Sequence, residues 1–445
     1  MKKEQSTLMQ LFVPICLETL FYMLAGMVDT LMLSSVSDQA VGAVGTANTY
    51  IGIFIIMFSV ITSGMLAVMT QNIGAGKPGV AYQASRMGIA FNSVLGVLLG
   101  IFLFAGSGAI LRVVGIADSL MAPANTYLQI VGGFCIFNAL IPIFSGYLRA
   151  FGHSKESLIA TVISNLLNFG LNALFLFVFD MGVMGVAIAT VISKALNLII
   201  VMIEAHVLIR DAKNDPSRLP GKTILGQIIK IGLPSALETA LYNVAMTLVI
   251  RFLNQMDHDG LNVTARSYTM QITNFSYCAG AALAQANAIL TGWRIGAGDY
   301  DACDKQTKRS VVIGILTAIA LEGLITLFGK PIMHLFSDDP VMIDLVVKLL
   351  AIDIVLEIGR VSNLILGNAL KTAGDALFPV IIAAIFMYLC AVGGTYVFGI
   401  HMGLLVVGSY IGLAADECIR AVGMFLRWQS GKWRTMSLVQ EKEPS

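Results

Sequence analysis

The sequence predicts an all-α integral membrane protein with 12 transmembrane helices in two pseudo-symmetric six-helix lobes. Three observations support this fold class: an apolar composition, a series of long apolar windows and an internal repeat. Of the 445 residues, 57% are hydrophobic and only 12% are charged, whereas soluble domains carry about 25% charged residues. The apolar residues suffice for about twelve spans of roughly 20 residues each.

The predicted spans are long apolar windows separated by polar or glycine-rich turns. They cover 8–34, 47–72, 84–107, 123–148, 157–179, 185–209, 225–253, 262–291, 310–329, 344–368, 377–399 and 404–428. The first window is too long for a signal peptide and lacks a small-residue cleavage site, so we interpret it as a membrane helix.

Lysine and arginine residues are distributed unevenly between the two sides of this topology. Twenty of the 28 lie on the side that holds both termini, including Lys2, Lys3 and Lys442, whereas the other side has only Arg112 and Lys330. Because positive loops stay in the cytoplasm, we expect a multi-pass protein of the inner (plasma) membrane with both termini cytoplasmic. A net charge of +1 gives no basis for nucleic-acid binding.

An internal repeat relates the two halves of the chain at an offset of 220 to 222 residues. Three motifs recur in order: Pro14, Glu18, Thr19 and Tyr22 as Pro234, Glu238, Thr239 and Tyr242; 73–76 as 295–298; and Leu148-Arg149-x-x-Gly152 as Leu370-Lys371-x-x-Gly374. The predicted parts are a first lobe (1–209), a charged cytoplasmic linker (210–224), a second lobe (225–428) and a cytoplasmic tail (429–445). Such paired lobes are typical of alternating-access transporters.

These motifs resemble the MATE (multidrug and toxic compound extrusion) family of transporters over nearly the whole chain. The resemblance rests on the proline-containing first span with Val28-Asp29-Thr30, Gln71-x-x-Gly74-Ala75-Gly76, Leu148-Arg149-Ala150-x-Gly152, and Gly182-x-x-Gly185-x-Ala187-x-Ala189-Thr190. It implies a V-shaped pair of six-helix lobes that exports organic, often cationic or amphipathic compounds. It also implies coupling to the inward movement of Na⁺ or H⁺.

The first candidate site centres on Asp29 in the outer half of span 8–34, where an ionised carboxylate needs a proton, a cation or hydrogen-bond donors. Asn168 and Asn172 share one helix face at i, i+4, and Thr190 begins the next span at similar depth. Oxygen atoms of these residue types suit a hard cation. The resemblance implies a Na⁺ or H⁺ site at these four positions, and a purely structural Asp29 is the alternative.

Two features leave the coupling ion open. Some members of the resembled family have a second Asp at the position of Asn172, and its absence lowers the formal charge of the site. Lys194 lies one turn after Thr190, where its ammonium group is a candidate to neutralise Asp29 directly. In that case Asp29 would be half of an ion pair rather than a cation ligand.

Buried charges in the second lobe form the second candidate site, for substrate binding or proton relay. Asp353, Glu357 and Arg360 form one stripe at i, i+4 and i+7 in mid-span and must face protein or water. The resemblance implies that an acid here contributes to cation or substrate binding, with Asp353 as the candidate. Neutralising pairs, Glu357 with Arg360 and Asp416 with Arg420, are the alternative reading.

Glu18 and Glu238 are the repeat-related glutamates, each four residues after a proline. The resemblance implies that a glutamate in the seventh span can bind a cation, so Glu238 joins the candidate relay. The alternative is that both glutamates cap or brace helices near the cytoplasmic side.

The function predicted for the chain is secondary active multidrug export against Na⁺ or H⁺, with small amphipathic or cationic molecules and membrane lipid as partners. No GxxxxGK[ST] phosphate-binding loop occurs, so this chain is not an ATP-driven pump that carries its own ATPase domain. No ATPase subunit is implied. No HExxH occurs, so nothing resembles a membrane protease, and no CxxC pair occurs, so the cysteines form no metal or disulfide framework. We expect neither an enzyme nor a cofactor. A flippase for lipid-linked oligosaccharides or phospholipids and a non-transporting scaffold are the alternatives.

Overall fold

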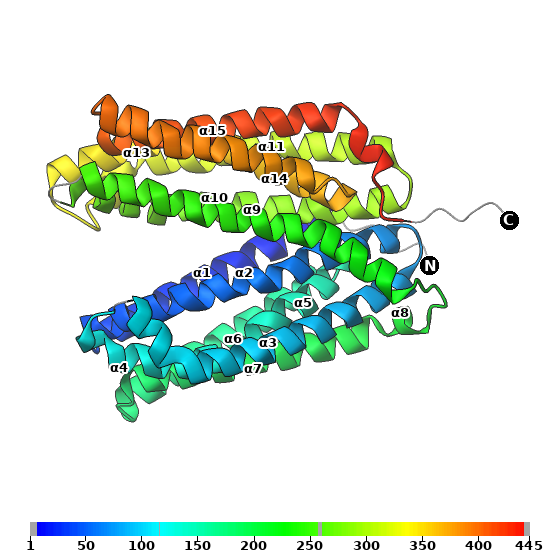
Figure 1. Cartoon of the computed structure of the whole chain (residues 1–445), viewed down its shortest axis with the longest axis horizontal. Coiled ribbons are helices and arrows are strands. Elements are labelled where there is room, and N and C mark those ends of the chain that lie inside the picture. The colour runs from blue at the N-terminus through cyan, green and yellow to red at the C-terminus, as the bar shows by residue number, and fades with distance from the viewer. Residues whose placement is uncertain (1–6, 115, 257–259, 440–445) are drawn as a thin grey trace. The chain divides into compact units, whose positions relative to one another are not determined.

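The computed structural model describes residues 7–114, 116–256 and 260–439, which are almost entirely helical and contain no strand (Figure 1). The longer helices are α1 (Leu8–Ser34), α2 (Asp38–Gly74), α3 (Pro78–Val114), α4 (Asp118–Tyr127), α5 (Ile136–Ala150), α6 (Ser154–Ala173), α7 (Gly182–Leu208), α9 (Gly221–Met256), α10 (Leu261–Gly296), α11 (Tyr300–Leu327), α13 (Pro340–Ala373), α14 (Leu377–Phe386) and α15 (Leu405–Gln429). The shorter helices are α8 (Arg210–Asn214) and α12 (Gly329–Met333), the π-helical segments η1 (Leu128–Gly132), η2 (Leu174–Val178), η3 (Met387–Val392) and η4 (Thr395–His401), and the 3₁₀-helix η5 (Lys432–Thr435).

The helices correspond to the twelve predicted spans. In the described part of the chain, eight helical segments are long and apolar enough to cross a membrane, and the bent pair Asp118–Gly132 and Ile136–Ala150 makes a ninth span with a 44° bend. The other three predicted spans coincide with α10, α13 and α15, of 36, 34 and 25 residues. These helices are long enough to span a bilayer, but each carries buried charged residues.

Several helices begin before the apolar windows that predicted them. The predicted window at 47–72 falls inside α2, which begins at Asp38 because the Ser37 hydroxyl accepts a hydrogen bond from the Ala40 amide at 3.0 Å. Hydropathy marks only the apolar part of a helix, whereas capping groups set its ends. The predicted charge asymmetry includes Lys2, Lys3 and Lys442, which lie outside the described residues.

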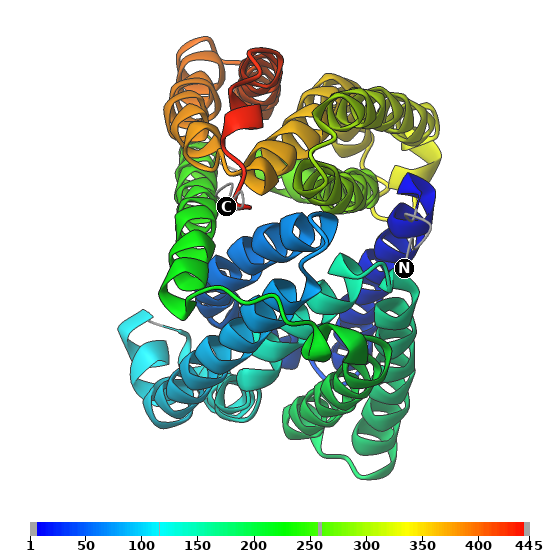
Figure 2. The same cartoon turned by 90° about the vertical axis from the view of Figure 1, so that its right-hand side faces the viewer.

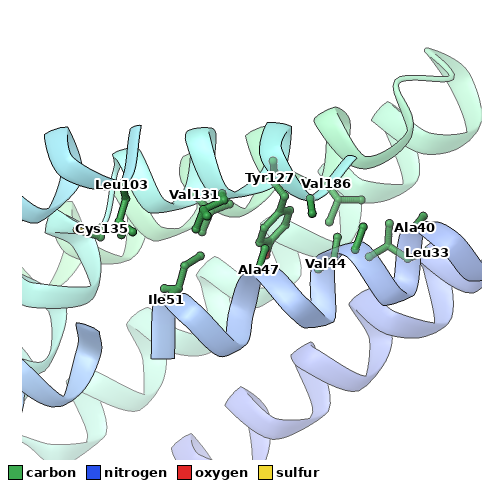
Figure 3. Close-up of a cluster of buried hydrophobic side chains, with 14 of the residues drawn as sticks. Leu33, Ala40, Val44, Ala47, Ile51, Leu103, Tyr127, Val131, Cys135 and Val186 are labelled. Carbon is green, nitrogen blue, oxygen red and sulfur yellow. The ribbon is translucent and has the colours of Figure 1, made fainter. Parts of the chain in front are cut away.

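Contacts divide the chain into two compact units, Met1–Gly232 and Leu233–Ser445. In unit 1, α1 packs on α6, α2 on α3, and α5 on α7. A core of buried apolar side chains joins α2, α4 and α7, with Tyr127 placed among Ala47, Val131 and Val186 (Figure 3). Tyr127 therefore brings a hydroxyl group into an otherwise apolar core.

Unit 1 ends inside α9, beyond the predicted linker. A Cβ atom on Gly64 of α2 would lie 1.9 Å from the Ile228 carbonyl oxygen, and one on Gly232 would lie 1.6 Å from that of Val60. Glycine at both positions lets α2 and the beginning of α9 approach with their backbones nearly in contact. The first turns of α9 consequently pack as part of unit 1.

The segment predicted as a linker, 210–224, is ordered against α3. It contains α8 and the first residues of α9. The Gln83 side chain donates to the Leu219 carbonyl at 2.8 Å and accepts from the Leu219 amide at 3.1 Å. Asp215 accepts from the Gly79 amide at 3.2 Å. Its hydrogen bond from the Ser217 hydroxyl, helped by backbone amides, holds the pKa of Asp215 below its ordinary value.

In unit 2, α13 packs against α10, α11 and α15, which places it in the middle of the bundle. Figure 2 shows the helices of this unit nearly end-on. A Cβ atom on Gly359 of α13 would lie 2.7 Å from the Cys418 amide nitrogen of α15. This close approach brings the charged residues of α13 and α15 together.

Part of the predicted cytoplasmic tail folds onto unit 2. Trp433 in η5 stacks on Trp428 with ring centroids 4.2 Å apart, and both side chains are buried. The Trp428 indole donates to Asp304 at 2.8 Å, and Arg434 forms an ion pair with Asp301 at 2.9 Å. The segment that follows α15 is thus fixed to the start of α11.

Candidate functional site

Asp29 on α1 faces two asparagines of α6. The Asn172 amide nitrogen donates to Asp29 Oδ1 at 2.6 Å and to Asn168 Oδ1 at 3.2 Å. The fully buried Asn172 therefore turns a hydrogen-bond donor toward the carboxylate. A donor in this position stabilises the ionised form of a carboxylate. The structure thus brings together three of the four residues predicted for this site.

The amide oxygen of Asn172 is available to another ligand. Asn172 Oδ1 is buried and has no hydrogen-bond partner in the part of the chain that the structure describes. Buried polar atoms are normally paired, so this oxygen is a candidate acceptor for a proton donor, a water molecule or a cation.

Thr190 joins the site through Tyr127. The Thr190 hydroxyl donates to the Val186 carbonyl at 2.8 Å, which leaves its oxygen free to accept. Tyr127, at the end of α4, interacts through its phenol with Thr190 and Asn48 and electrostatically with Asp29. Its orientation in the core is visible in Figure 3. Sequence reasoning missed Tyr127 because no motif distinguishes it from an ordinary core aromatic.

Lys194 of α7 does not form an ion pair with Asp29 in this arrangement. Its ammonium group donates to Asn138 Oδ1 of α5 at 2.8 Å, and no ion pair joins Lys194 to Asp29 among the described residues. The Lys194 charge is still near enough to act on Asp29. Asn138 was not predicted, because nothing in the sequence indicates which of two acceptors the lysine reaches.

In unit 2, the structure brings Glu357 and Arg360 of α13 together with Glu417 of α15. Glu357 and Arg360 form an ion pair, and Arg360 Nε lies 3.7 Å from Glu417 Oε1. Asp353 is buried on the same helix. Its Oδ2 has no hydrogen-bond partner within the described ranges. The predicted stripe therefore contains one internal ion pair and one carboxylate without an arginine in contact.

A second arginine completes this network. Arg420 donates to both carboxylate oxygens of Asp416, at 2.9 and 2.7 Å, and contacts Glu417 at 2.9 Å. Glu417 also accepts from the Asn363 amide at 3.0 Å. Bidentate pairs of this kind are strong and geometrically specific. The ion pairs that the sequence offered as alternatives, Glu357 with Arg360 and Asp416 with Arg420, are both formed.

Glu322 of α11 lies near this network. It is fully buried, and the charges of Asp353 and Glu357 act on it. The sequence contained a signal for Glu322, since an acidic residue within an apolar span is a functional-site candidate. Its neighbours on α10 and α13 could not be identified without the fold.

Glu18 and Glu238 occupy equivalent ion pairs in the two units. Arg149 Nη2 lies 2.7 Å from Glu18 Oε1, and Lys371 Nζ lies 2.6 Å from Glu238 Oε2. Ser157 also donates to Glu18 at 2.9 Å. Both partners belong to the repeated Leu-Arg/Lys-x-x-Gly motif. The structure therefore places Glu238 in a brace between α9 and α13, although its charge also acts on Arg420.

Neither site contains the dense ligand set of a tightly bound metal. The described residues include no group of three or more His, Cys, Asp or Glu side chains placed to hold a metal ion. The Asp29 site instead offers one carboxylate with amide and hydroxyl oxygens.

The fold and the buried polar groups in both units define a multi-span membrane transporter. The MatE family model matches residues 14–174 and 234–397, so the two matches begin at the prolines of the sequence repeat. The transporter YisQ of Bacillus subtilis, whose name calls it uncharacterized, is 35% identical over 94% of this chain and 93% of its own length. The chain belongs to the MATE family of transporters.

More distant relatives agree with this assignment. A probable multidrug resistance protein NorM of Thermotoga maritima is 24% identical over 97% of this chain and 94% of its own length. Among solved structures, an outward-facing multidrug resistance MATE family transporter matches with a TM-score of 0.87 at 21% identity, covering 95% of this chain and 94% of that one. A transporter of Pyrococcus furiosus matches with the same TM-score at 20% identity and the same coverage. These structural similarities support the twelve-span fold.

Proposed function

We propose that this chain exports small organic compounds, cationic or amphipathic, across the plasma membrane in exchange for inward movement of Na⁺ or H⁺. Both termini then lie in the cytoplasm. Support comes from the family, from the relatives named for multidrug resistance and from the duplicated helical units. Promiscuous export requires weak, releasable binding of substrate and coupling ion rather than a tight site.

Asp29 carries the coupling in this proposal. Its carboxylate is half-buried in unit 1, accepts a hydrogen bond from Asn172 and has no ion-pair partner among the described residues. Unpaired acids inside membrane spans are typical of proton and cation pathways. Asn168, Asn172 and Thr190 add oxygen atoms for a cation, and Tyr127 adds a hydroxyl.

Asp353 is the proposed contact of unit 2 for substrate or proton. Glu357 and Arg360 already form an ion pair, so their role is to hold the polar cluster in place. Glu238 is engaged by Lys371 and is the least suited of the predicted relay residues to take up a proton.

The test is efflux of ethidium, a fluorescent cation, from cells that express wild type or Asp29→Asn at matched membrane levels. Asp118→Asn is the control, because Asp118 is an exposed acid of the same unit. We expect the efflux rate of Asp29→Asn to be roughly 10-fold or more below that of wild type. A factor of ten corresponds to about 1.4 kcal/mol of free energy. Asp118→Asn should match wild type.

The same assay distinguishes the coupling ions. Dependence on external Na⁺ at fixed pH indicates Na⁺ coupling, whereas loss of efflux with an uncoupler alone indicates proton coupling. Wild-type efflux by Asp29→Asn would contradict the proposed role of Asp29. Absence of efflux in wild type would contradict export of organic cations.

A further inference from the structure

Glu322 is a fully buried acid of unit 2. It lies on α11 with a side chain that has no exposed surface, and the Ser276 hydroxyl of α10 is the neighbouring group able to hydrogen-bond to its carboxyl. No described lysine, arginine or histidine forms an ion pair with it. An ionised carboxylate in this position would bear a large desolvation cost without an ion pair to offset it.

The groups that face Glu322 make an ionised form still less favourable. Asp353 and Glu357 on α13 act on it with negative charge, and Arg360 acts on it with the opposite charge. Arg360 is already engaged by Glu357 and Glu417. From α10, the facing polar group is the buried Ser276 hydroxyl.

The formal charges around Glu322 support the same conclusion. Five buried carboxylates lie in or next to the ion-pair network, namely Glu322, Asp353, Glu357, Asp416 and Glu417. Ion pairs join three of them, Glu357, Asp416 and Glu417, to Arg360 and Arg420. Glu322 and Asp353 have no ion-pair partner within the described ranges. Like charges in a low-dielectric interior repel strongly.

A small void lies near Glu322 among helices α10, α11 and α13. It has a volume of about 10 Å³ and is bounded by α10, α11 and α13, with Ser276 and Glu357 among its lining residues. That volume is close to the minimum for one water molecule. Polar side chains of α10 and α13 therefore border a space near Glu322 that is just large enough for one water molecule.

We propose that Glu322 is a proton-holding site of unit 2, separate from the Asp29 site of unit 1. Its carboxyl group carries a proton at neutral pH, with Ser276 opposite it and Asp353 and Glu357 as nearby acceptors. Transfer of the proton to Glu357 would leave Glu322 as the carboxylate and Glu357 as the acid, so the total charge of the cluster would be unchanged. A role for this proton in coupling rests on the proposed export function, whereas its presence on Glu322 does not.

Infrared spectroscopy of the purified full-length protein tests the proposal without any transport assay. A protonated carboxyl group has a carbonyl stretch distinct from that of a carboxylate. We expect wild type at neutral pH to show this band, shifted by ¹³C-labelled glutamate, and we expect Glu322→Gln to lose one such carboxyl. Asp118→Asn should leave the band unchanged. Glu322→Asp, which retains an acid at the position, should retain a protonated carboxyl at a shifted frequency.

Either of two results would overturn the proposal. One is a glutamate-labelled spectrum with no protonated carboxyl at neutral pH. The other is loss of the band on titration with Na⁺ at fixed pH, which would make Glu322 a metal-cation ligand. If Glu322→Gln does not fold, the labelled wild type and Glu322→Asp decide the question. Because these readouts need no substrate, failure of ethidium efflux leaves them interpretable.

Discussion

The two units share a helical plan but differ in the charge of their interiors. In unit 1, the half-buried Asp29 accepts a hydrogen bond from Asn172, Lys194 donates to Asn138, and the buried Glu18 is paired with Arg149. Unit 2 has a network of acids and arginines centred on Glu417, which contacts both Arg360 and Arg420. Duplication thus preserved the fold while the polar interiors diverged. We infer that unit 1 is suited to gain and lose a cation, and that unit 2 is held together by its charges.

The substitution expected to lower the free energy of unfolding most is Arg420→Met. Arg420→Met leaves Asp416 and Glu417 buried without their shared partner, and removal of one member of a buried ion pair costs about 3–5 kcal/mol. Lys194→Met in unit 1 removes one charge-assisted hydrogen bond, to Asn138, which is worth about 1.5–3 kcal/mol. Denaturant unfolding of the purified variants in detergent measures both losses in free energy. Equal losses would contradict the difference between the two interiors.

Helix packing in unit 1 gives the next largest effect. Gly64→Ala would place a Cβ atom 1.9 Å from the Ile228 carbonyl oxygen, so α2 and α9 must separate. Overpacking of this kind costs about 3 kcal/mol. Gly170→Ala is the matched control, because its Cβ atom finds nothing within 4 Å. In α6 it should stabilise by up to about 1 kcal/mol, since alanine is the better helix former. The free energies of unfolding should therefore change in opposite directions.

The equivalent braces should behave alike in the two units. Double-mutant cycles on Glu18 with Arg149 and on Glu238 with Lys371 should each give a coupling free energy of about 1–2 kcal/mol. Both pairs are partly buried and close, at 2.7 and 2.6 Å. A measurable coupling free energy in only one unit would contradict this expectation. It would show that the two ion pairs differ in strength, as the interior charges of the two units differ.

The smallest expected effect concerns the ordered segment between α7 and α9. The folded-state pKa of Asp215 lies below its ordinary value of 3.8. The contribution of Asp215 to holding segment 210–224 against α3 is therefore present above pH 3.8. That contribution is lost as the pH falls through the folded-state pKa. Pepsin should therefore cleave wild type at 210–220 increasingly as the pH falls below 3.8. Asp215→Asn should remove this pH dependence and cost about 0.5 kcal/mol. A pH-independent cleavage rate in wild type would contradict this role.

Most of the fold could be predicted from the sequence. The apolar windows indicate the membrane-spanning helices, and the internal repeat indicates the two helical units. The charged helices α10, α13 and α15 were also predicted as apolar windows, although they are not among the described helices whose hydropathy alone marks them as membrane spans. The boundary of unit 1 at Gly232 could not be predicted, since it depends on backbone contacts between α2 and α9.

The candidate site was predicted only where its residues share a helix face or stand alone in an apolar span. Asn168 and Asn172 are one turn apart, and Asp29 is an isolated acid, so all three were visible in the sequence. Tyr127 and Asn138 were not, because their roles depend on which helices pack together. The sequence also could not place Lys194, since its long side chain reaches more than one acceptor.

The central claim is that Asp29 in unit 1 couples cation entry to export. The most direct test reconstitutes wild type, Asp29→Asn and Asp118→Asn in liposomes and measures ethidium transport driven by an imposed gradient of protons or of Na⁺. We predict that one of the two gradients drives transport by wild type and by Asp118→Asn, and that Asp29→Asn does not exceed protein-free liposomes. Gradient-driven transport by Asp29→Asn at the wild-type rate would contradict the account.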